Sequence, residues 1–148
     1  MGKYTFWLWT AAIIQIITAA IHSLALFRTP SPQNETERQL FDLMYNYKPD
    51  MGAGFHPSMA DFLTGLSSCF TLLYLFAGLM NIYIIRKNLS AETVKGFTSI
   101  NLLIFGASFL IMLVFTFLPP IVLAGLVFLS LCFAYATNHI HVIQLGKD

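Results

Sequence analysis

The fold of this chain is decided by the sequence from Gly96 to Ile143, GFTSINLLIFGASFLIMLVFTFLPPIVLAGLVFLSLCFAYATNHIHVI. It contains no Lys, Arg, Asp or Glu, and Pro119-Pro120 divides it into two apolar stretches. A helix of about 20 apolar residues crosses the ~30 Å hydrocarbon core of a membrane, so each stretch is long enough to span. Neither stretch alternates between apolar and polar residues as the strands of a membrane barrel do. The pattern therefore favours spanning helices.

Two further stretches of this kind, about Tyr4–Phe27 and Phe62–Ile85, also lack charged residues. Together with the polar residues at their ends, the four stretches predict spans over about 4–27, 57–85, 91–118 and 120–143. The links between the last three spans are short, so we expect sequential helices to be antiparallel neighbours. The predicted fold is all-α: an integral membrane four-helix bundle of up-down-up-down topology, forming one domain over residues 1–148.

The composition agrees with a membrane domain, since 57% of the 148 residues are hydrophobic and 10% are charged. A net charge of +1 gives no basic surface for nucleic acid, which we exclude as a partner. The side with more Lys and Arg faces the cytoplasm, so both termini are expected there. That side carries Lys3, Arg86, Lys87, Lys95 and Lys147, and the exterior side carries Arg28, Arg38 and Lys48.

The first exterior loop, about Arg28 to Phe55, is long enough to carry structure of its own. Asn34-Glu35-Thr36-Glu37 is an Asn version of the capping box that begins helices. The apolar residues that follow recur on one helical face: Leu40, Leu43, Met44 and Tyr47. We therefore expect a short amphipathic helix over about 34–47, either resting on lipid or covering a pocket. Met51-Gly52-Ala53-Gly54 is expected to form a flexible return to the second span.

Polar residues inside spans are costly in a membrane and therefore point to function. In the first two spans they form two faces that we expect to meet, with Gly65 allowing close approach. The expected register places His22 level with Asp61, and Gln15 level with Ser67 and Ser68. The candidate binding residues are Gln15, Thr18, His22, His56, Asp61 and Ser68.

Three interpretations of these residues stay open. His22 and Asp61 form a structural pair between two helices, or they act in a proton relay, a ligand anchor or an acid/base pair. The third is a metal site from His22, His56 and Asp61, a donor set that suits zinc or iron, although the spacing matches no known motif. We expect no metal to be bound.

A second polar layer lies near the cytoplasmic ends of the spans, where we expect structural or interfacial contacts. It consists of Asn81, Ser99, Asn101, Asn138, His139 and His141. No cofactor is expected. His22 lies near the exterior end of the first span, whereas His139 and His141 lie near the cytoplasmic end of the fourth span. At ~1.5 Å per residue, that separation prevents ligation of one haem iron by both.

Three local features of the sequence resemble those of a known protein family. The first span ends in Ile21-His22-Ser23, a Pro- and Glu-containing loop helix runs from Pro32 to Met44, and the second span opens with DFLTGLS from Asp61. In these features the chain resembles the small bacterial four-helix membrane proteins called DoxX-like. The resemblance implies a bacterial inner-membrane location and a loose association with redox or respiratory assemblies. It carries no catalytic residue onto this sequence.

The expected function is that of a non-enzymatic integral membrane protein. It would be an accessory subunit of a larger membrane complex or a small lipid- or ligand-binding protein, because no G-x-S-x-G, H-E-x-x-H or P-loop motif occurs. The expected partners are membrane lipids and either a larger membrane-protein complex or further copies of the chain. The alternative is a small membrane enzyme acting on a lipid, quinone or sterol-like substrate, with His22 and Asp61 as its acid/base pair.

Overall fold

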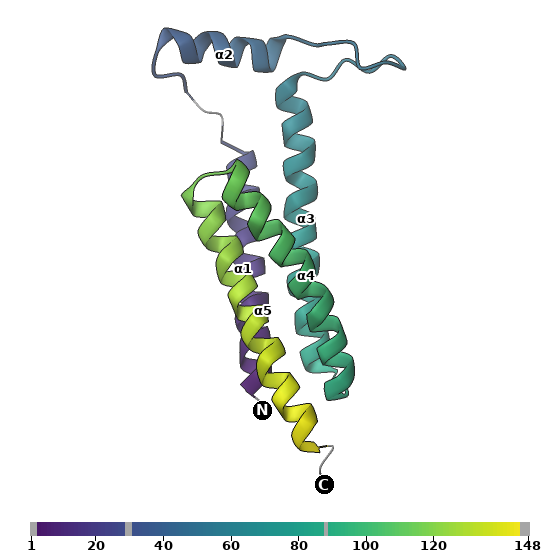
Figure 1. Cartoon of the computed structure of the whole chain (residues 1–148). Helices are drawn as coiled ribbons and strands as arrows, with labels where there is room; N and C mark the ends of the chain where they lie inside the picture. Colours follow the sequence, from purple (N-terminus) through teal and green to yellow (C-terminus); the bar gives the residue numbers. More distant parts are fainter. Residues whose placement is uncertain (1–2, 29–30, 88, 146–148) are drawn as a thin grey trace. The chain divides into compact units, whose positions relative to one another are not determined.

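The structure is a computed structural model that describes residues 3–28, 31–87 and 89–145, with side chains described as far as residue 138. It has five α-helices (Figure 1): α1 Lys3–Leu26, α2 Glu35–Asn46, α3 Met59–Arg86, α4 Ala91–Phe115 and α5 Leu118–Leu145. The described residues contain no strand. The predicted all-α class is confirmed.

Four of the helices are long and apolar enough to cross a membrane: α1, α3, α4 and the part of α5 from Leu118 to Asn138. By the length and composition of these helices the chain is an integral membrane protein. The helix α4 ends at Phe115, short of the predicted 118, because Pro119 and Pro120 have no N–H with which to continue it. Proline is favoured in the first turn of a helix, and both residues lie in the first turn of α5.

Local capping fixes where α2 and α4 begin. The Asn34 Oδ1 accepts a hydrogen bond from the Glu37 N–H at 2.9 Å, and the Glu37 carboxylate accepts one from the Gln33 N–H at 2.7 Å. The Ser90 Oγ accepts from the Thr93 N–H at 3.2 Å. The Glu37 and Thr93 N–H groups are donors that the first helical turn leaves unpaired. The bond at Asn34 confirms the predicted start of the loop helix, and α4 begins at Ala91, as the predicted span does.

The chain divides into two units, which are described separately. Unit 1 contains residues 1–18 and 74–148, and unit 2 contains residues 19–73. Unit 1 therefore includes the first part of α1, the last part of α3, and all of α4 and α5. Unit 2 includes the end of α1, the helix α2 and the first part of α3.

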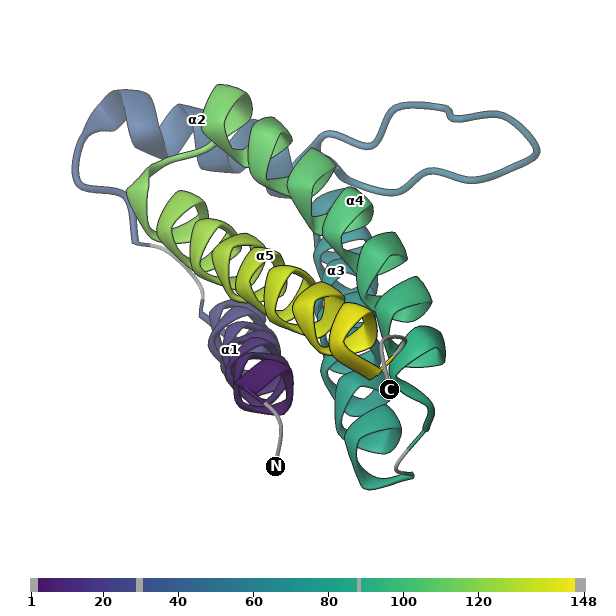
Figure 2. The same cartoon turned by 60° about the horizontal axis from the view of Figure 1, so that its bottom comes forward.

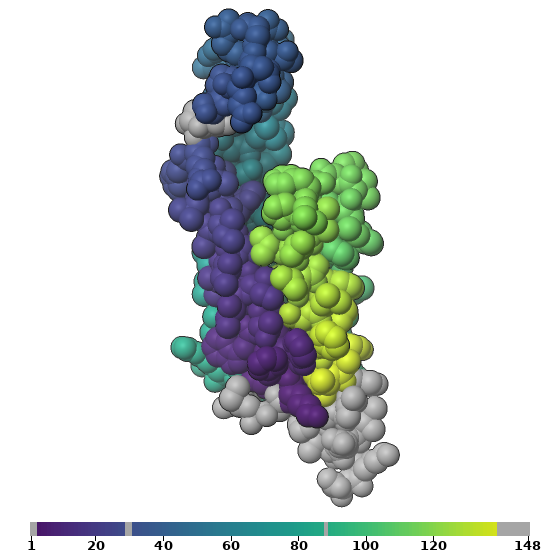
Figure 3. Space-filling model, turned by 90° about the vertical axis from the view of Figure 1, so that its left-hand side faces the viewer, coloured from purple at the N-terminus to yellow at the C-terminus, as the bar shows by residue number. Residues whose placement is uncertain are grey.

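Unit 1 holds nearly the whole core. Its buried apolar residues are Leu8, Ala11, Ala12, Tyr74, Ile84, Val94, Phe105, Ala124, Val127, Leu131 and Ala134. Figure 3 shows the beginning of α1 against α5, where the rings of Trp7 and Phe133 stack with centroids 4.7 Å apart. The helices α3 and α4 are in contact through Tyr74 and Phe105, whose rings pack edge to face with centroids 5.3 Å apart. Small residues on the buried faces let these helices approach closely.

The helices α4 and α5 lie side by side (Figures 1 and 2) and pack through two reciprocal contacts between glycine and phenylalanine. A Cβ added to Gly106 would lie 3.0 Å from the ring of Phe128, and one added to Gly125 would lie 3.0 Å from the ring of Phe109. The two rings are stacked, with centroids 5.9 Å apart and an angle of 16° between their planes. Each ring thus occupies the space that its facing glycine leaves open.

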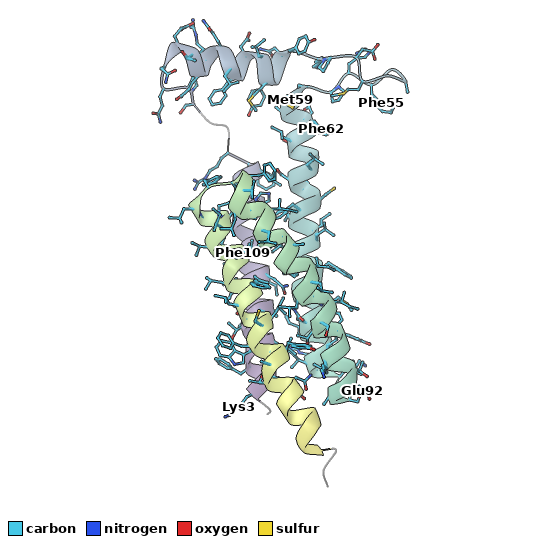
Figure 4. All side chains as sticks on the ribbon, in the orientation of Figure 1. Lys3, Phe55, Met59, Phe62, Glu92 and Phe109 are labelled. Atoms are coloured by element: carbon cyan, nitrogen blue, oxygen red, sulfur yellow. The ribbon has the colours of Figure 1, made fainter. Side chains whose placement is uncertain are left out.

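Unit 2, in contrast, has almost no core. Among its described residues only Ala19 and Ser58 are buried, and α2 buries none. The segment 51–55 forms a turn in which the Met51 N–H donates to the Phe55 carbonyl and the Phe55 N–H donates to the Gly52 carbonyl, both at 3.0 Å. The return to α3 that we expected at 51–54 thus includes a hydrogen-bonded turn. Figure 4 shows Phe55 on this loop and Phe62 on the first part of α3.

Candidate functional site

The six residues of the candidate binding site do not fall in one unit. Gln15 and Thr18 belong to unit 1, whereas His22, His56, Asp61 and Ser68 belong to unit 2. The Thr18 and Ser68 hydroxyls each donate to a carbonyl four residues earlier in their own helix, at 2.8 Å. Bonds of this kind satisfy the hydroxyl locally. His56 is exposed in the segment between the 51–55 turn and α3.

Asp61 takes part in capping the N-terminus of α3. The Asp61 Oδ2 accepts hydrogen bonds from the Ser58 N–H at 3.0 Å and the Ser58 hydroxyl at 2.8 Å, and the Asp61 N–H donates to the Ser58 Oγ at 3.1 Å. This reciprocal pairing is a capping box. Its sequence signal is Ser58-Met59-Ala60-Asp61, a Ser followed three residues later by an acid, which our sequence analysis overlooked.

His22 lies beside Phe70, with ring centroids 4.8 Å apart in an edge-to-face arrangement. Its Nε2 is buried and has no hydrogen-bond partner within the described ranges. Phe70 comes nine residues after Asp61, which is about 13 Å along a helix. The predicted His22–Asp61 pair is therefore wrong: the carboxylate binds Ser58, and the imidazole packs on an aromatic ring.

The polar contact between α1 and α3 involves Gln15 and Asn81. The Asn81 Nδ2 donates to the Gln15 Oε1 over 2.8 Å, and both side chains are at most 1% exposed. Asn81 lies 13 residues after Ser68, so the predicted register, with Gln15 level with Ser67 and Ser68, is wrong. The point of closest approach is also different, because a Cβ at Gly65 would meet nothing within 4 Å, whereas one at Gly78 would stand 3.1 Å from the Ala12 carbonyl oxygen.

Among the described side chains, each helix of unit 1 buries one amide. These are Gln15 on α1, Asn81 on α3, Asn101 on α4 and Asn138 on α5. The Asn101 Nδ2 donates to the Phe97 carbonyl in its own helix at 3.1 Å, and the Asn138 Nδ2 donates across to the Ala91 carbonyl at 3.0 Å. Such bonds between helices stabilise membrane bundles by about 1 kcal/mol each. Asn81, Asn101 and Asn138 were predicted to lie in the cytoplasmic layer, but the bond between Asn81 and Gln15 was not anticipated.

Two other members of the cytoplasmic layer, His139 and His141, have side chains outside the described part of the chain. Ser99 donates to the Lys95 carbonyl in its own helix at 3.0 Å. Among the residues that the structure describes, no group of three or more His, Cys, Asp or Glu side chains is placed to hold a metal ion. Among the side chains of unit 1 that the structure describes, the buried polar groups are amides and hydroxyls, which bind by hydrogen bonds and do not change charge near neutral pH.

The surface of α2 carries an open hollow of about 370 Å³, lined by Glu35, Arg38, Gln39 and Asp42. All four residues come from the polar side of this one helix. The apolar residues Leu40, Leu43 and Tyr47 are each more than half exposed. The prediction that they cover a pocket therefore gains no support from this hollow.

Comparison with protein-family models, with curated proteins and with solved structures found no match to this chain.

Proposed function

We propose that the chain is a non-enzymatic integral membrane protein that works as an accessory subunit of a larger membrane complex. The observation that supports this proposal is the absence of a core from the described part of unit 2. Exposed apolar side chains of unit 2 also occur outside the spans. In the segment that connects α1 to α3, five such side chains are 52–69% exposed: Leu40, Leu43, Tyr47, Met51 and Phe55. Large exposed apolar side chains that gather into a patch mark interaction sites, and we propose that these residues serve as one.

The enzyme alternative has lost its main support. It required His22 and Asp61 to act together, and a general acid and base must lie within hydrogen-bond reach of the same reacting group. His22 packs on Phe70 while Asp61 caps α3 through Ser58. We therefore propose no catalytic residue.

The proposal includes the location that the DoxX-like resemblance implies, the bacterial inner membrane, with both termini in the cytoplasm. The orientation follows from five basic residues on one side of the spans against three on the other. In this orientation α2 and the 51–55 turn lie on the exterior side of the inner membrane. The partner surface that covers them would then belong to the exterior face of the complex.

Purification of the full chain from its native membrane in a mild detergent tests the proposal. We expect a stoichiometric protein partner, and we expect Leu40→Glu/Leu43→Glu to release it. The matched control is Thr36→Glu/Gln39→Glu, which adds the same charge to exposed positions on the same helix and should keep the partner.

Elution of the unchanged chain without a partner protein would contradict the accessory-subunit proposal. Retention of the partner by Leu40→Glu/Leu43→Glu would show that another surface holds it. If the unchanged chain elutes with lipid alone and the Leu40→Glu/Leu43→Glu variant loses that lipid, the apolar side of α2 rests on the bilayer.

A further inference from the structure

The buried amides of Gln15 and Asn81 in unit 1 share one hydrogen bond. Beside this bond, one amide nitrogen and one amide oxygen have no partner in the described part of the chain. The Asn81 Nδ2 donates to the Gln15 Oε1 over 2.8 Å. Within the part of the chain that the structure describes, the Gln15 Nε2 and the Asn81 Oδ1 have no hydrogen-bond partner, and both atoms are out of contact with solvent. Buried polar atoms of this kind are rare in folded proteins, and each one calls for a physical explanation.

Reversing the amide groups does not remove the mismatch. The oxygen and nitrogen of an amide are assigned from the hydrogen-bond network, so both side chains can be turned over. The Gln15 nitrogen then donates to the Asn81 oxygen, and the other oxygen and nitrogen are left without partners. Turning over only one amide places two oxygens or two nitrogens against each other. Every arrangement that keeps the bond therefore leaves one amide nitrogen and one amide oxygen without a partner.

We propose that Gln15 and Asn81 bind one hydroxyl oxygen, which accepts a hydrogen bond from the Gln15 side chain and donates one to the Asn81 side chain. A hydroxyl group both donates and accepts, and its source is either a water molecule or the hydroxyl of an amphiphile. Buried waters typically join two to four polar groups in this way. The inference concerns unit 1 alone and does not rest on the proposed function.

The neighbouring backbone limits the size of what binds. Gly78 lies three residues before Asn81, and a Cβ there would stand 2.8 Å from the Ile16 Cγ1 and 3.1 Å from the Ala12 carbonyl oxygen. The helices α1 and α3 are thus too close at this level for a ring-sized group. This close approach, one helical turn from Asn81, favours a group as small as a hydroxyl.

Counting along α3 and α4 from one contact between them makes Thr98 a candidate third partner. The contact between Tyr74 and Phe105 sets the register of α3 against α4. Seven residues further along α3 and seven back along α4, Asn81 comes level with Thr98, which is buried. The Thr98 hydroxyl donates to the Val94 carbonyl at 2.7 Å, and its oxygen keeps lone pairs with which to accept.

Nuclear magnetic resonance on the intact, ¹⁵N-labelled and otherwise deuterated chain tests the proposal. The first preparation uses lauryldimethylamine oxide, which has no hydroxyl group, so that water is the only small molecule with one. We expect the Gln15 side-chain amide to give a through-space cross-peak at the water frequency, with the sign that distinguishes contact from chemical exchange. The Asn101 amide, whose nitrogen donates to the Phe97 carbonyl, is the internal control and should give none.

Protein hydroxyls also resonate at the water frequency, so the measurement is repeated on Thr18→Val/Thr98→Val. We expect the Gln15 cross-peak to persist in this variant. Its loss there would overturn the proposal, because the contact would then belong to a threonine.

A second preparation in dodecyl maltoside distinguishes the two sources of the hydroxyl. The same cross-peak in both detergents assigns the hydroxyl to water. A contact that appears only in maltoside, together with cross-peaks to sugar C–H protons, assigns it to an amphiphile. Absence of the Gln15 contact from both preparations would overturn the proposal.

Discussion

Gly78 of α3 lies so close to Ile16 of α1 that a Cβ at position 78 would stand 2.8 Å from the Ile16 Cγ1. The same Cβ would be 3.1 Å from the Ala12 carbonyl oxygen, a backbone atom that moves only if the helix moves. Gly65 is also on α3, yet a Cβ there would meet no described atom within 4 Å. Two glycines of one helix therefore have different roles.

Alanine substitution of these two glycines should affect the free energy of unfolding differently. Gly78→Ala should lower the free energy of unfolding by about 1–3 kcal/mol, the usual effect of overpacking. Gly65→Ala is the matched control and should leave it unchanged or raise it by up to about 1 kcal/mol, through helix propensity. Unfolding in mixed micelles with increasing sodium dodecyl sulfate measures both. Equal effects would contradict the close approach at Gly78.

The hydrogen bond between Gln15 and Asn81 predicts energetic coupling. Gln15→Leu and Asn81→Leu should each lower the free energy of unfolding by about 1–2 kcal/mol, because each leaves a buried amide without its partner. The double variant should cost less than the sum by at least about 0.5 kcal/mol. The control cycle combines Gln15→Leu with Asn101→Leu, since Asn101 bonds within its own helix, and it should be additive. Additivity in both cycles would show that Gln15 and Asn81 do not interact.

The capping box predicts that Asp61 is coupled to Ser58 and independent of His22. Ser58→Ala should reduce the hydrogen-exchange protection of the first α3 amides about fivefold, because loss of an N-cap costs about 1 kcal/mol. Adding Asp61→Ala should reduce this protection little further, since the two residues form one unit.

His22→Ala provides the contrasting cycle, because His22 contacts Phe70. In the double variant His22→Ala/Asp61→Ala, the loss of hydrogen-exchange protection of the first α3 amides, expressed as a free energy, should equal the sum of the losses in the two single variants. A strong coupling between His22 and Asp61 would restore the pair that the sequence suggested.

Labelling with a membrane-impermeant maleimide measures the orientation. Single cysteines replace Asn34 and Asn88 in a Cys69→Ser/Cys132→Ser background, which removes both native thiols. We expect Asn34→Cys to react in intact cells, and Asn88→Cys to react only after permeabilisation, because basic residues favour the cytoplasmic side. Reaction of Asn88→Cys in intact cells would invert the proposed topology.

Much of the fold was predictable because it depends on local sequence. Charge-free stretches long enough to span predicted the four long helices, and the capping signal at Asn34 predicted the start of α2. The bounds of α4 were less well predicted at its end, where Pro119 and Pro120 stop the helix before the apolar sequence ends.

The candidate site was less predictable because it depends on how two apolar helices pair. Counting residues from the exterior ends of the spans assumed that His22 and Asp61 lie at equal depth. Asp61 instead belongs to the first turn of α3, and the contact of α1 with α3 is set by the space at Gly78. Nothing in the sequence around Gly65 and Gly78 separates the glycine that is covered from the one that is not.

The reciprocal glycine–phenylalanine contacts also restrict how α4 and α5 can slide along each other. Sliding by four residues, about one helical turn, would move the Phe128 ring from Gly106 onto Leu102 or Leu110. It would move the Phe109 ring from Gly125 onto Ile121 or Leu129. Both rings would then collide with bulky side chains, so that each glycine excludes the neighbouring mispairings as well as accommodating the native one. The hairpin consequently has a single way to close, even though almost every residue around these contacts is apolar.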